Sequence, residues 1–168
     1  RLMRDLKIRI FPDPVLEKEC EEVDDIDDEL VDLAQSMIVT MKEAEGLGLS
    51  APQVGVLKRL FVCKDFADAD EQRSLVLINP KIIDFEGRVE SKEGCLSIPG
   101  FYDYIYRHER VSMTALDLDG KQQSFNCDGM HSIVLQHEFD HLDGILFPER
   151  MTKIKKEIFL KKINKAFK

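Results

Sequence analysis

Two histidines one helical turn apart give the strongest chemical signal in the sequence. Residues 136–141 are Q-H-E-F-D-H, which places His137 and His141 at positions i and i+4. On an α-helix both imidazoles then project from one face and can bind a single metal ion. Glu138 lies one step around the helix from His137, so it can reach a metal-bound water without being a ligand. The alternative is that both histidines only satisfy hydrogen bonds in the core and that Glu138 is exposed.

A catalytic metal typically has three protein ligands and one open position for water, so two histidines need a further partner. Glu157 follows His141 by sixteen residues, a spacing that some metalloproteases use, but its lysine-rich surroundings favour a surface charge. Cys95 is the better candidate, because Gly94 allows a close backbone approach and a thiolate binds soft or borderline ions strongly. Taken alone, Cys95 would be interpreted as a buried core thiol. Two histidines and a thiolate suit Zn²⁺, Fe²⁺, Co²⁺ or Ni²⁺, and the order of affinities does not choose among them.

A glycine-rich segment precedes these residues in the chain. Residues 46–55 are G-L-G-L-S-A-P-Q-V-G. The glycines are too close together for a dinucleotide-binding fingerprint, and no strand is expected before them, so phosphate binding is disfavoured. We expect a tight loop that presents backbone groups and the side-chain amide of Gln53.

Three helices are expected around these segments. Asp27 is a suitable N-cap for a helix that ends near Glu45, where glycines follow. A second helix begins at Asp128-Gly129, carries the two histidines and ends at Gly144. A third helix spans residues 151–166, with a stripe formed by Ile154, Ile158, Phe159, Lys162 and Ile163.

Short runs of β-branched and aromatic residues indicate several strands. They span residues 59–64, 74–79, 81–85, 88–92, 104–107, 111–118 and 121–126. The polar residues 65–73 predict a hairpin-type connection, and Asp119-Gly120 predicts a two-residue hairpin turn. Many short strands with three helices predict an α+β fold, in which antiparallel β-sheets pack around a central helix carrying H-E-x-x-H, with N-terminal and C-terminal helices.

The length and composition predict a single globular domain over residues 1–168. Of the 168 residues, 43% are hydrophobic and 33% are charged, which excludes a disordered or low-complexity chain. The net charge of −8 argues against general nucleic-acid affinity, so no DNA partner is expected. No apolar run is long enough to span a membrane and no export signal opens the chain, so we expect a cytoplasmic protein with free thiols. The four cysteines form no C-x-x-C pair, which excludes a zinc ribbon.

The charge is unevenly distributed along the chain. Residues 151–168, which we call the basic tail, contain seven lysines, including Lys168, against one glutamate. The simplest interpretation is a solvated amphipathic helix whose apolar stripe packs on the body of the protein. Its lysines occupy a different face and stay available for a negatively charged partner.

Three segments in this order, G-L-G-L-S-A-P-Q, E-G-C-L-S and Q-H-E-F-D-H, resemble the signature motifs of the peptide deformylases. The similarity extends from the early I-x-x-x-P-D-P-V-L segment to the basic tail, which is similar to that of bacterial members. The resemblance implies removal of the N-formyl group from the formyl-methionine of newly made polypeptides, with metal-bound hydroxide as nucleophile and formate as product. It also implies nascent N-formylmethionyl peptides as partners, contact of the basic tail with the ribosome, and no membrane association. A cytoplasmic bacterial protein is expected, and an organellar form stays open.

The resemblance also assigns roles to individual positions. The matching metal ligands are Cys95, His137 and His141. The matching catalytic groups are Glu138 as general acid/base, with Gln53 and the Leu96 N–H as donors to the formyl oxygen. The matching substrate-binding positions are Leu47, Gly48, Gly94, Met130, Ile133, Val134 and His137, the last four forming a pocket for the methionine side chain. The metal expected from the resemblance is Fe²⁺, with Zn²⁺, Ni²⁺ or Co²⁺ as alternatives.

Two positions depart from the family's pattern. Ser50 stands where the first motif usually has alanine, which is a small change. Tyr102 stands where some members carry an arginine that is proposed to meet the downstream end of the peptide, and Arg107 lies further on. These departures concern how the second and third substrate residues are held rather than the chemistry.

Other functions remain open from the sequence. A metalloprotease of the H-E-x-x-H type would differ in its third ligand and would cleave internal peptide bonds. A non-catalytic ribosome-associated relative is disfavoured because every chemical position is present. A metal-storage role is disfavoured because three protein ligands leave a fourth position open.

Overall fold

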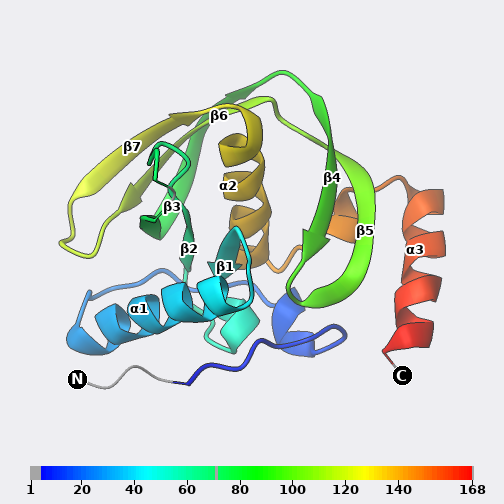
Figure 1. Cartoon of the computed structure of the whole chain (residues 1–168), viewed down its shortest axis with the longest axis horizontal. Helices are drawn as coiled ribbons and strands as arrows, with labels where there is room; N and C mark the ends of the chain where they lie inside the picture. The colour runs from blue at the N-terminus through cyan, green and yellow to red at the C-terminus, as the bar shows by residue number, and fades with distance from the viewer. Residues whose placement is uncertain (1–4, 71, 168) are drawn as a thin grey trace.

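The computed structural model describes residues 5–70 and 72–167 and places two antiparallel β-sheets on either side of a central helix (Figure 1). One sheet has the order β1-β2-β3-β6-β7, formed by Gly48–Ser50, Leu60–Lys64, Ser74–Glu86, Arg110–Leu116 and Gln122–Cys127. The other pairs β4 (Val89–Cys95) with β5 (Ile98–Arg107). The α-helices of the described part are α1 (Asp28–Glu43), α2 (Gly129–Leu142) and α3 (Lys153–Ala166). The predicted α+β fold is confirmed.

Helix α1 covers one face of the five-stranded sheet. It begins where predicted, because the Asp27 carboxylate accepts a hydrogen bond of 2.8 Å from the backbone N–H of Leu30. Its buried stripe packs against β2 in one core cluster, which includes Leu30, Leu33, Met37, Met41, Leu60 and Val62. These apolar residues of α1 recur every three or four positions, so they lie on one face of the helix.

Strand β2 separates α1 from α2. Leu60 and Val62 belong to the core shared with α1, whereas Phe61 and Cys63 belong to the core shared with α2. Because successive side chains of a strand point to opposite faces, a fully buried β2 carries a helix on each side. Helix α2 thus lies with one side on this sheet and the other toward β4 and β5 (Figure 1).

Helix α3 closes the far side of the two-stranded sheet. Phe159 and Ile163 are buried together with Ile98 and Ile105 of β5. Three members of the predicted stripe do not contribute, because Ile154 is 73% exposed, Ile158 is 54% exposed and Lys162 is also exposed. The apolar contact is narrower than a full helical stripe, since only one row of α3 faces the sheet. Lys168 of the basic tail lies outside the described residues.

Three local predictions were wrong. Residues 74–79 and 81–85 form one strand, β3, in which the pairing with β6 shifts between Ile78 and Lys81, so that Pro80 is accommodated. The glycine-rich segment is not only a loop, because it forms β1 and a short 3-10 helix, Ala51–Val54. The turn at Gly120 is longer than two residues, since the N–H of Asp117 donates to the carbonyl of Lys121 at 2.9 Å.

In the part of the chain that the structure describes, no helix is long and apolar enough to cross a membrane.

Candidate metal centre

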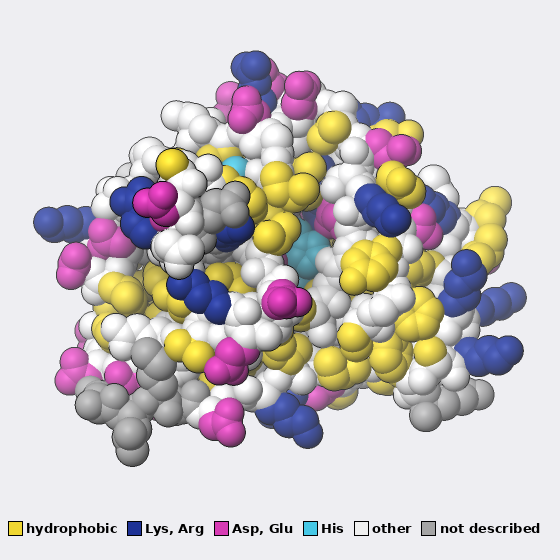
Figure 2. Space-filling view, viewed as in Figure 1, with side chains coloured by type: hydrophobic (Ala, Val, Ile, Leu, Met, Phe, Trp, Pro, Cys, Tyr) yellow, Lys and Arg dark blue, Asp and Glu magenta, His cyan; other side chains and the backbone are white. Residues whose placement is uncertain are grey.

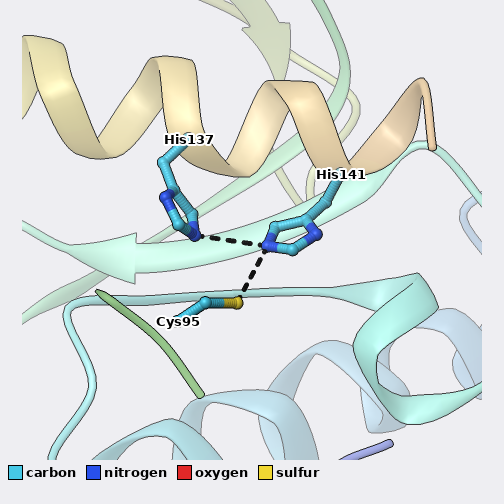
Figure 3. Close-up of side chains that lie close together, drawn as sticks. All are labelled: Cys95, His137 and His141. Carbon is cyan, nitrogen blue, oxygen red and sulfur yellow. Dashed lines mark hydrogen bonds between the residues drawn. The ribbon is translucent and has the colours of Figure 1, made fainter. Parts of the chain in front are cut away.

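The sulfur of Cys95 and the ring nitrogens of two histidines meet between β4 and α2 (Figure 3). Cys95 ends β4, and both histidines project from the side of α2 that faces this strand. The Cys95 Sγ lies 3.4 Å from His141 Nε2, which lies 3.3 Å from His137 Nε2. All three atoms are within 4.8 Å of one another. The structure thus brings together the three predicted metal ligands from segments more than 40 residues apart.

The three atoms fit a tetrahedral metal site. Ligand atoms at about 2.0–2.3 Å from a metal ion are about 3.3–3.6 Å apart in a tetrahedron, which agrees with the two separations above. The Nδ1 of His137 lies 2.9 Å from Glu93 Oε1, so this carboxylate holds the ring proton and leaves Nε2 free to bind a metal. Burial would raise the pKa of Glu93, but hydrogen bonds from Arg107 and His137 outweigh it and lower the pKa to about 2.

The two histidines differ in their protonation without a metal. Burial favours the neutral form of His137, but the neighbouring Cys95 and Glu93 outweigh burial and raise its pKa well above the usual value. For His141, burial and the nearby His137 lower the pKa well below the usual value.

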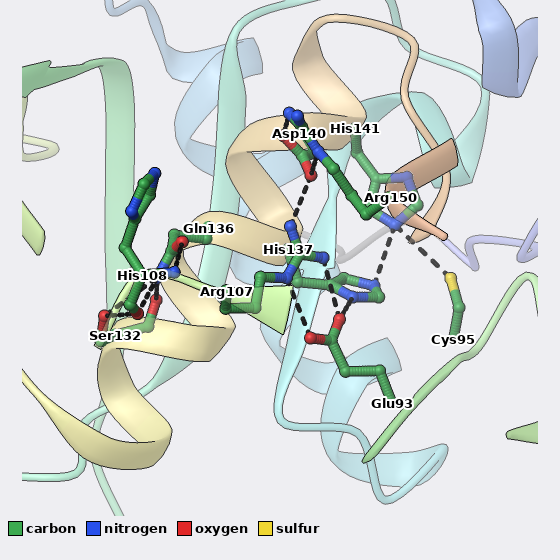
Figure 4. Close-up of polar contacts among 10 residues, drawn as sticks. All are labelled: Glu93, Cys95, Arg107, His108, Ser132, Gln136, His137, Asp140, His141 and Arg150. Atoms are coloured by element: carbon green, nitrogen blue, oxygen red, sulfur yellow. Dashed lines mark hydrogen bonds and ion pairs between the residues drawn. The ribbon is translucent and has the colours of Figure 1, made fainter. Parts of the chain in front are cut away.

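Arg107 lies behind the histidines rather than in a substrate groove. Its Nε and Nη2 each donate to the Glu93 carboxylate at 2.9 Å, and its Nη1 donates to Asp140 Oδ2 at 2.6 Å (Figure 4). The residue is only 5% exposed. Its charge is committed to two buried carboxylates, so Arg107 does not replace the peptide-binding arginine of some relatives.

Glu138 faces the site with a carboxylate that has an unusual environment. It is 4% exposed, and its Oε1 is buried with no hydrogen-bond partner among the described residues. Burial raises its pKa to about 7. A Cβ on Gly48 would lie 2.6 Å from Glu138 Oε2, so only glycine lets β1 approach the carboxylate this closely. A carboxyl group with a pKa near neutrality can both accept and return a proton.

The side-chain amide of Gln53 is held in one orientation. Its Oε1 accepts hydrogen bonds from the N–H and the hydroxyl of Ser50, both at 2.9 Å. Its Nε2 donates to Ser97 Oγ at 3.1 Å and lies 3.4 Å from Cys95 Sγ. The departure at Ser50 therefore adds a hydrogen bond that alanine could not make, and the amide N–H₂ faces the metal ligands.

A pocket of about 420 Å³ opens above these groups. Figure 2 shows a histidine at the bottom of a hollow in the surface. The predicted substrate-binding residues all line this pocket, namely Leu47, Gly48, Gly94, Met130, Ile133, Val134 and His137. Gln53, Cys95, Leu96 and Glu138 line it too, whereas Arg107 does not. Tyr102 also lines it, and its ring packs so closely on Gly94 that a Cβ there would lie 2.4 Å from the ring.

Two unpaired strand edges form opposite walls of the pocket. Strand β1 is the end strand of the five-stranded sheet, and β4 pairs only with β5 among the described strands. Both contribute lining residues, Gly48 from β1 and Ser91 to Cys95 from β4. An extended peptide between two such edges can hydrogen-bond to backbone on both sides.

Comparisons with known proteins agree with this geometry. A family model described as polypeptide deformylase matches residues 5–157. The chain belongs to the polypeptide deformylase family. A deformylase of Thermodesulfovibrio yellowstonii is 47% identical over 157 residues, covering 94% of this chain and 95% of the relative. A deformylase of Alkalilimnicola ehrlichii is 42% identical over 160 residues, covering 95% and 89%.

Solved deformylase structures share the fold. A peptide deformylase from Legionella pneumophila superposes with a TM-score of 0.88 at 39% identity, covering 98% of this chain and 95% of that one. A peptide deformylase from Ehrlichia chaffeensis in complex with actinonin gives 0.89 at 37% identity, covering 99% of both chains. The deformylase family is thus supported by sequence and by structure over nearly the whole chain.

Three groups at this deformylase site had no role assigned from the sequence: Glu93, Ser97 and Asp140. Glu93 could have been found from the period of a strand, because it alternates with Ser91 on the inward face of β4 just before Cys95. Ser97 and Asp140 carry no such signal. Their partners, Gln53 and Arg107, are more than 30 residues away in the chain.

Proposed function

We propose that this chain removes the N-formyl group from peptides that begin with formyl-methionine and releases formate. The observation that carries the proposal is the convergence of Cys95, His137 and His141 beside a buried carboxylate, at the bottom of a pocket walled by two strand edges. Membership of the deformylase family supports the same reaction. We propose Fe²⁺ as the resident metal, with Zn²⁺, Ni²⁺ or Co²⁺ as alternatives that the same ligands suit.

Cys95, His137 and His141 would hold the metal. When bound, the ion supplies Lewis-acid chemistry, lowering the pKa of water and polarising a carbonyl group. Glu138 accepts the proton of the attacking water, and it later returns a proton to the leaving amide nitrogen. Its raised pKa of about 7, caused by burial, suits both roles at neutral pH.

Gln53 and the backbone N–H of Leu96 stabilise the charge that develops on the formyl oxygen. The fixed amide of Gln53 needs no reorganisation for this role, because Ser50 and Ser97 already set its direction. Loss of one such donor typically reduces the rate by about 10²–10³-fold.

The peptide binds as an added strand between β1 and β4. The backbone of Leu47 and Gly94 pairs with it, and the methionine side chain enters the part of the pocket lined by Met130, Ile133 and Val134. Helix α2 supplies both this lining and the histidines, so the binding of methionine places the formyl group beside the metal ligands.

Formate release from formyl-Met-Ala-Ser, assayed beside an unformylated longer peptide, tests the reaction. Protein prepared without oxygen should release formate from formyl-Met-Ala-Ser and should cleave no internal peptide bond in either peptide. Glu138→Gln should lower kcat by at least about a hundredfold. Glu157→Gln, which changes an exposed glutamate of α3, is the matched control and should leave kcat unchanged. Cleavage of the unformylated peptide would instead identify a metalloprotease.

Stability in air tests the choice of metal. The Fe²⁺ form should lose activity in aerated buffer much faster than the Ni²⁺ form, because both Fe²⁺ and the Cys95 thiolate can be oxidised. Equal half-lives of the two forms would contradict Fe²⁺ as the sensitive resident ion.

We also propose that the basic tail contacts the ribosome and that the protein acts in the bacterial cytoplasm, as its bacterial relatives suggest. Lys161, Lys162 and Lys165 are exposed on α3, whereas Lys155 and Lys156 are paired with Asp103 and Glu149 at 2.9 and 2.7 Å. Dark blue side chains project from the edge of the molecule where α3 lies (Figure 2).

Co-sedimentation with ribosomes at two salt concentrations tests this contact. Glutamine at the three exposed lysines of α3 should weaken binding, and binding should fall with added salt. Glutamine at three exposed lysines elsewhere, Lys7, Lys18 and Lys121, is the matched control. Salt-independent binding, or equal loss in both triple variants, would contradict a specific electrostatic contact.

A further inference from the structure

Arg150 clamps a buried carboxylate from the outside of the protein. It lies in the 3-10 helix Phe147–Arg150, which follows α2. Its Nη2 donates to Asp140 Oδ1 at 2.7 Å and its Nε donates to Oδ2 at 3.0 Å (Figure 4). The arginine side chain is 45% exposed, whereas that of Asp140 is 8% exposed.

This clamp is the outer end of a continuous chain of charges. Asp140 also accepts a hydrogen bond from Arg107, Arg107 binds Glu93 through its two other nitrogens, and Glu93 holds Nδ1 of a metal ligand. We call Arg150, Asp140, Arg107, Glu93 and His137 the ion chain. Every link is 3.0 Å or shorter, and the four inner members are buried.

Charge balance explains why the outer arginine matters. Glu93 and Asp140 are two buried carboxylates that share the guanidinium of Arg107, and Glu93 also has His137 as a partner. Arg150 supplies a further positive charge and raises the number of donors on Asp140 to three. Without it, the uncompensated Asp140 carboxylate would draw Arg107 toward itself, because an unpaired buried charge is costly. The contact of Arg107 with Glu93 would then loosen.

We infer that Arg150 is a positioning residue for the metal centre. Because Arg150 donates hydrogen bonds to Asp140, Arg107 keeps its contact with Glu93. Glu93 then fixes the ring of His137 with Nε2 toward the metal. This inference rests on the proposed metal-dependent function of the site. Partners behind a metal-bound histidine commonly control how tightly the metal is held.

The test compares Arg150→Met with Arg59→Met. Arg59 pairs with Asp143 at 3.0 Å and with the carbonyl of Leu142 at 3.1 Å, so it also holds the C-terminal end of α2. Among the described residues, the hydrogen bonds of Arg59 go to Leu142 and Asp143, outside the ion chain. Both proteins are loaded with Co²⁺, whose visible absorption reports ligand geometry, and Co²⁺ release to a chelator is timed.

Arg150→Met should release Co²⁺ about three- to tenfold faster than the unchanged protein, below the about 10–100-fold range for direct partners of a ligand, because Arg150 acts on His137 through three intermediate residues. Its absorption bands should shift, and kcat should fall with KM unchanged. Arg150→Lys should restore part of each effect, since it keeps the charge. Arg59→Met should keep the release rate within about twofold and leave the bands in place.

Two results would overturn the inference: Arg150→Met with an unchanged spectrum and release rate, or Arg59→Met with equal changes. If Arg150→Met fails to fold, Arg150→Gln, which keeps a donor without the charge, takes its place in the same comparison. Co²⁺ release and absorption do not depend on the substrate. If the unchanged protein binds Co²⁺ but releases no formate, the proposed function is refuted. The comparison of Arg150→Met with Arg59→Met then still tests the role of Arg150.

Discussion

At the scale of single residues, the contact between Gly48 and Glu138 leaves no room for a side chain at residue 48. A Cβ at residue 48 would lie 2.6 Å from Oε2 of Glu138 and 2.8 Å from its Cγ. The neighbouring backbone belongs to β1 and cannot retreat without breaking its pairing with β2. The carboxylate itself would have to move.

Gly48→Ala should therefore lower kcat by at least about a hundredfold, the contribution of a positioned acid/base group. Formate release and thermal unfolding should be measured together. Gly120→Ala is the control, because Gly120 has a φ of +76° in a distant turn. It should lose about 1–2 kcal/mol of stability through backbone strain and keep its activity. Full activity of Gly48→Ala would contradict the placement of Glu138.

The four thiols should also differ in reactivity. Burial raises the pKa of Cys20 and Cys127 to about 11, and raises that of Cys63 well above its usual value. Only thiolates react with alkylating reagents, so these three should be labelled slowly at pH 8, and tenfold faster per pH unit up to their pKa.

Cys95 should be the first thiol labelled in metal-free protein and should be protected when metal is bound. Mass spectrometry of the labelled peptides, with and without chelator, measures this. Protection of Cys20 or Cys127 by metal, in place of Cys95, would contradict the assigned ligand set.

The ligand atoms could be predicted from sequence because they follow a local rule. His137 and His141 are one helical turn apart, and Cys95 is in a short motif. The groups that orient them could not be predicted this way. Asp140 contacts Arg107, 33 residues earlier, and such a pairing depends on how a helix and a strand meet in space.

At the scale of elements, α3 is part of the site's support. Phe159 is 4% exposed and packs on Phe147 and Phe101, and Lys155 donates to the backbone carbonyl of Tyr104 on β5. Strand β5 in turn holds β4, which carries Cys95. Deleting the basic tail to test ribosome binding would therefore also disturb the metal centre.

Phe159→Ala should reduce the free energy of unfolding by about 3–5 kcal/mol, as removal of a buried phenylalanine typically does. Urea unfolding of the metal-free protein measures it. Ile158, the residue before Phe159, is 54% exposed, so Ile158→Ala should change the free energy of unfolding by less than about 0.5 kcal/mol. Equal effects of the two substitutions would contradict the packing of α3.

The helices were easier to predict than the strands. Asp27 caps α1, and Gly144, with a φ of +73°, follows α2 as expected. Strand β1 was missed because three residues with a glycine give no alternating pattern. It exists because β2 supplies its hydrogen-bond partners, which is a tertiary effect.

At the scale of the whole molecule, the metal would join two halves of the fold. Cys95 belongs to the two-stranded sheet, whereas α2 packs on the five-stranded sheet through Val134 and Leu135. An ion bound by both binds only the folded chain. It should stabilise that chain by about 2.7 kcal/mol at a hundredfold excess over Kd.

Thermal unfolding with Zn²⁺ and after chelation should show this gain as a higher Tm for the loaded protein. Cys95→Ala, which removes the sulfur but keeps both histidines, should lose most of the metal-dependent shift. The same rise in Tm for this variant would show that the metal acts elsewhere.

The fold class could be predicted from the number and lengths of the elements. The predicted packing of antiparallel sheets around the helix that carries the two histidines is confirmed, because α2 has a sheet on each side (Figure 1). That arrangement follows from β2 being buried on both faces and from the inward-facing Ser91 and Glu93 on β4.

The separation of the ligands along the chain has a consequence for biogenesis. Cys95 and His141 are 46 residues apart, and they meet only when β4, β5 and α2 have folded and packed together. During synthesis, the chain cannot form the three-ligand site until His141 has left the exit tunnel of the ribosome. The rise in visible absorption as Co²⁺ binds should therefore report the last stage of folding rather than an early collapse.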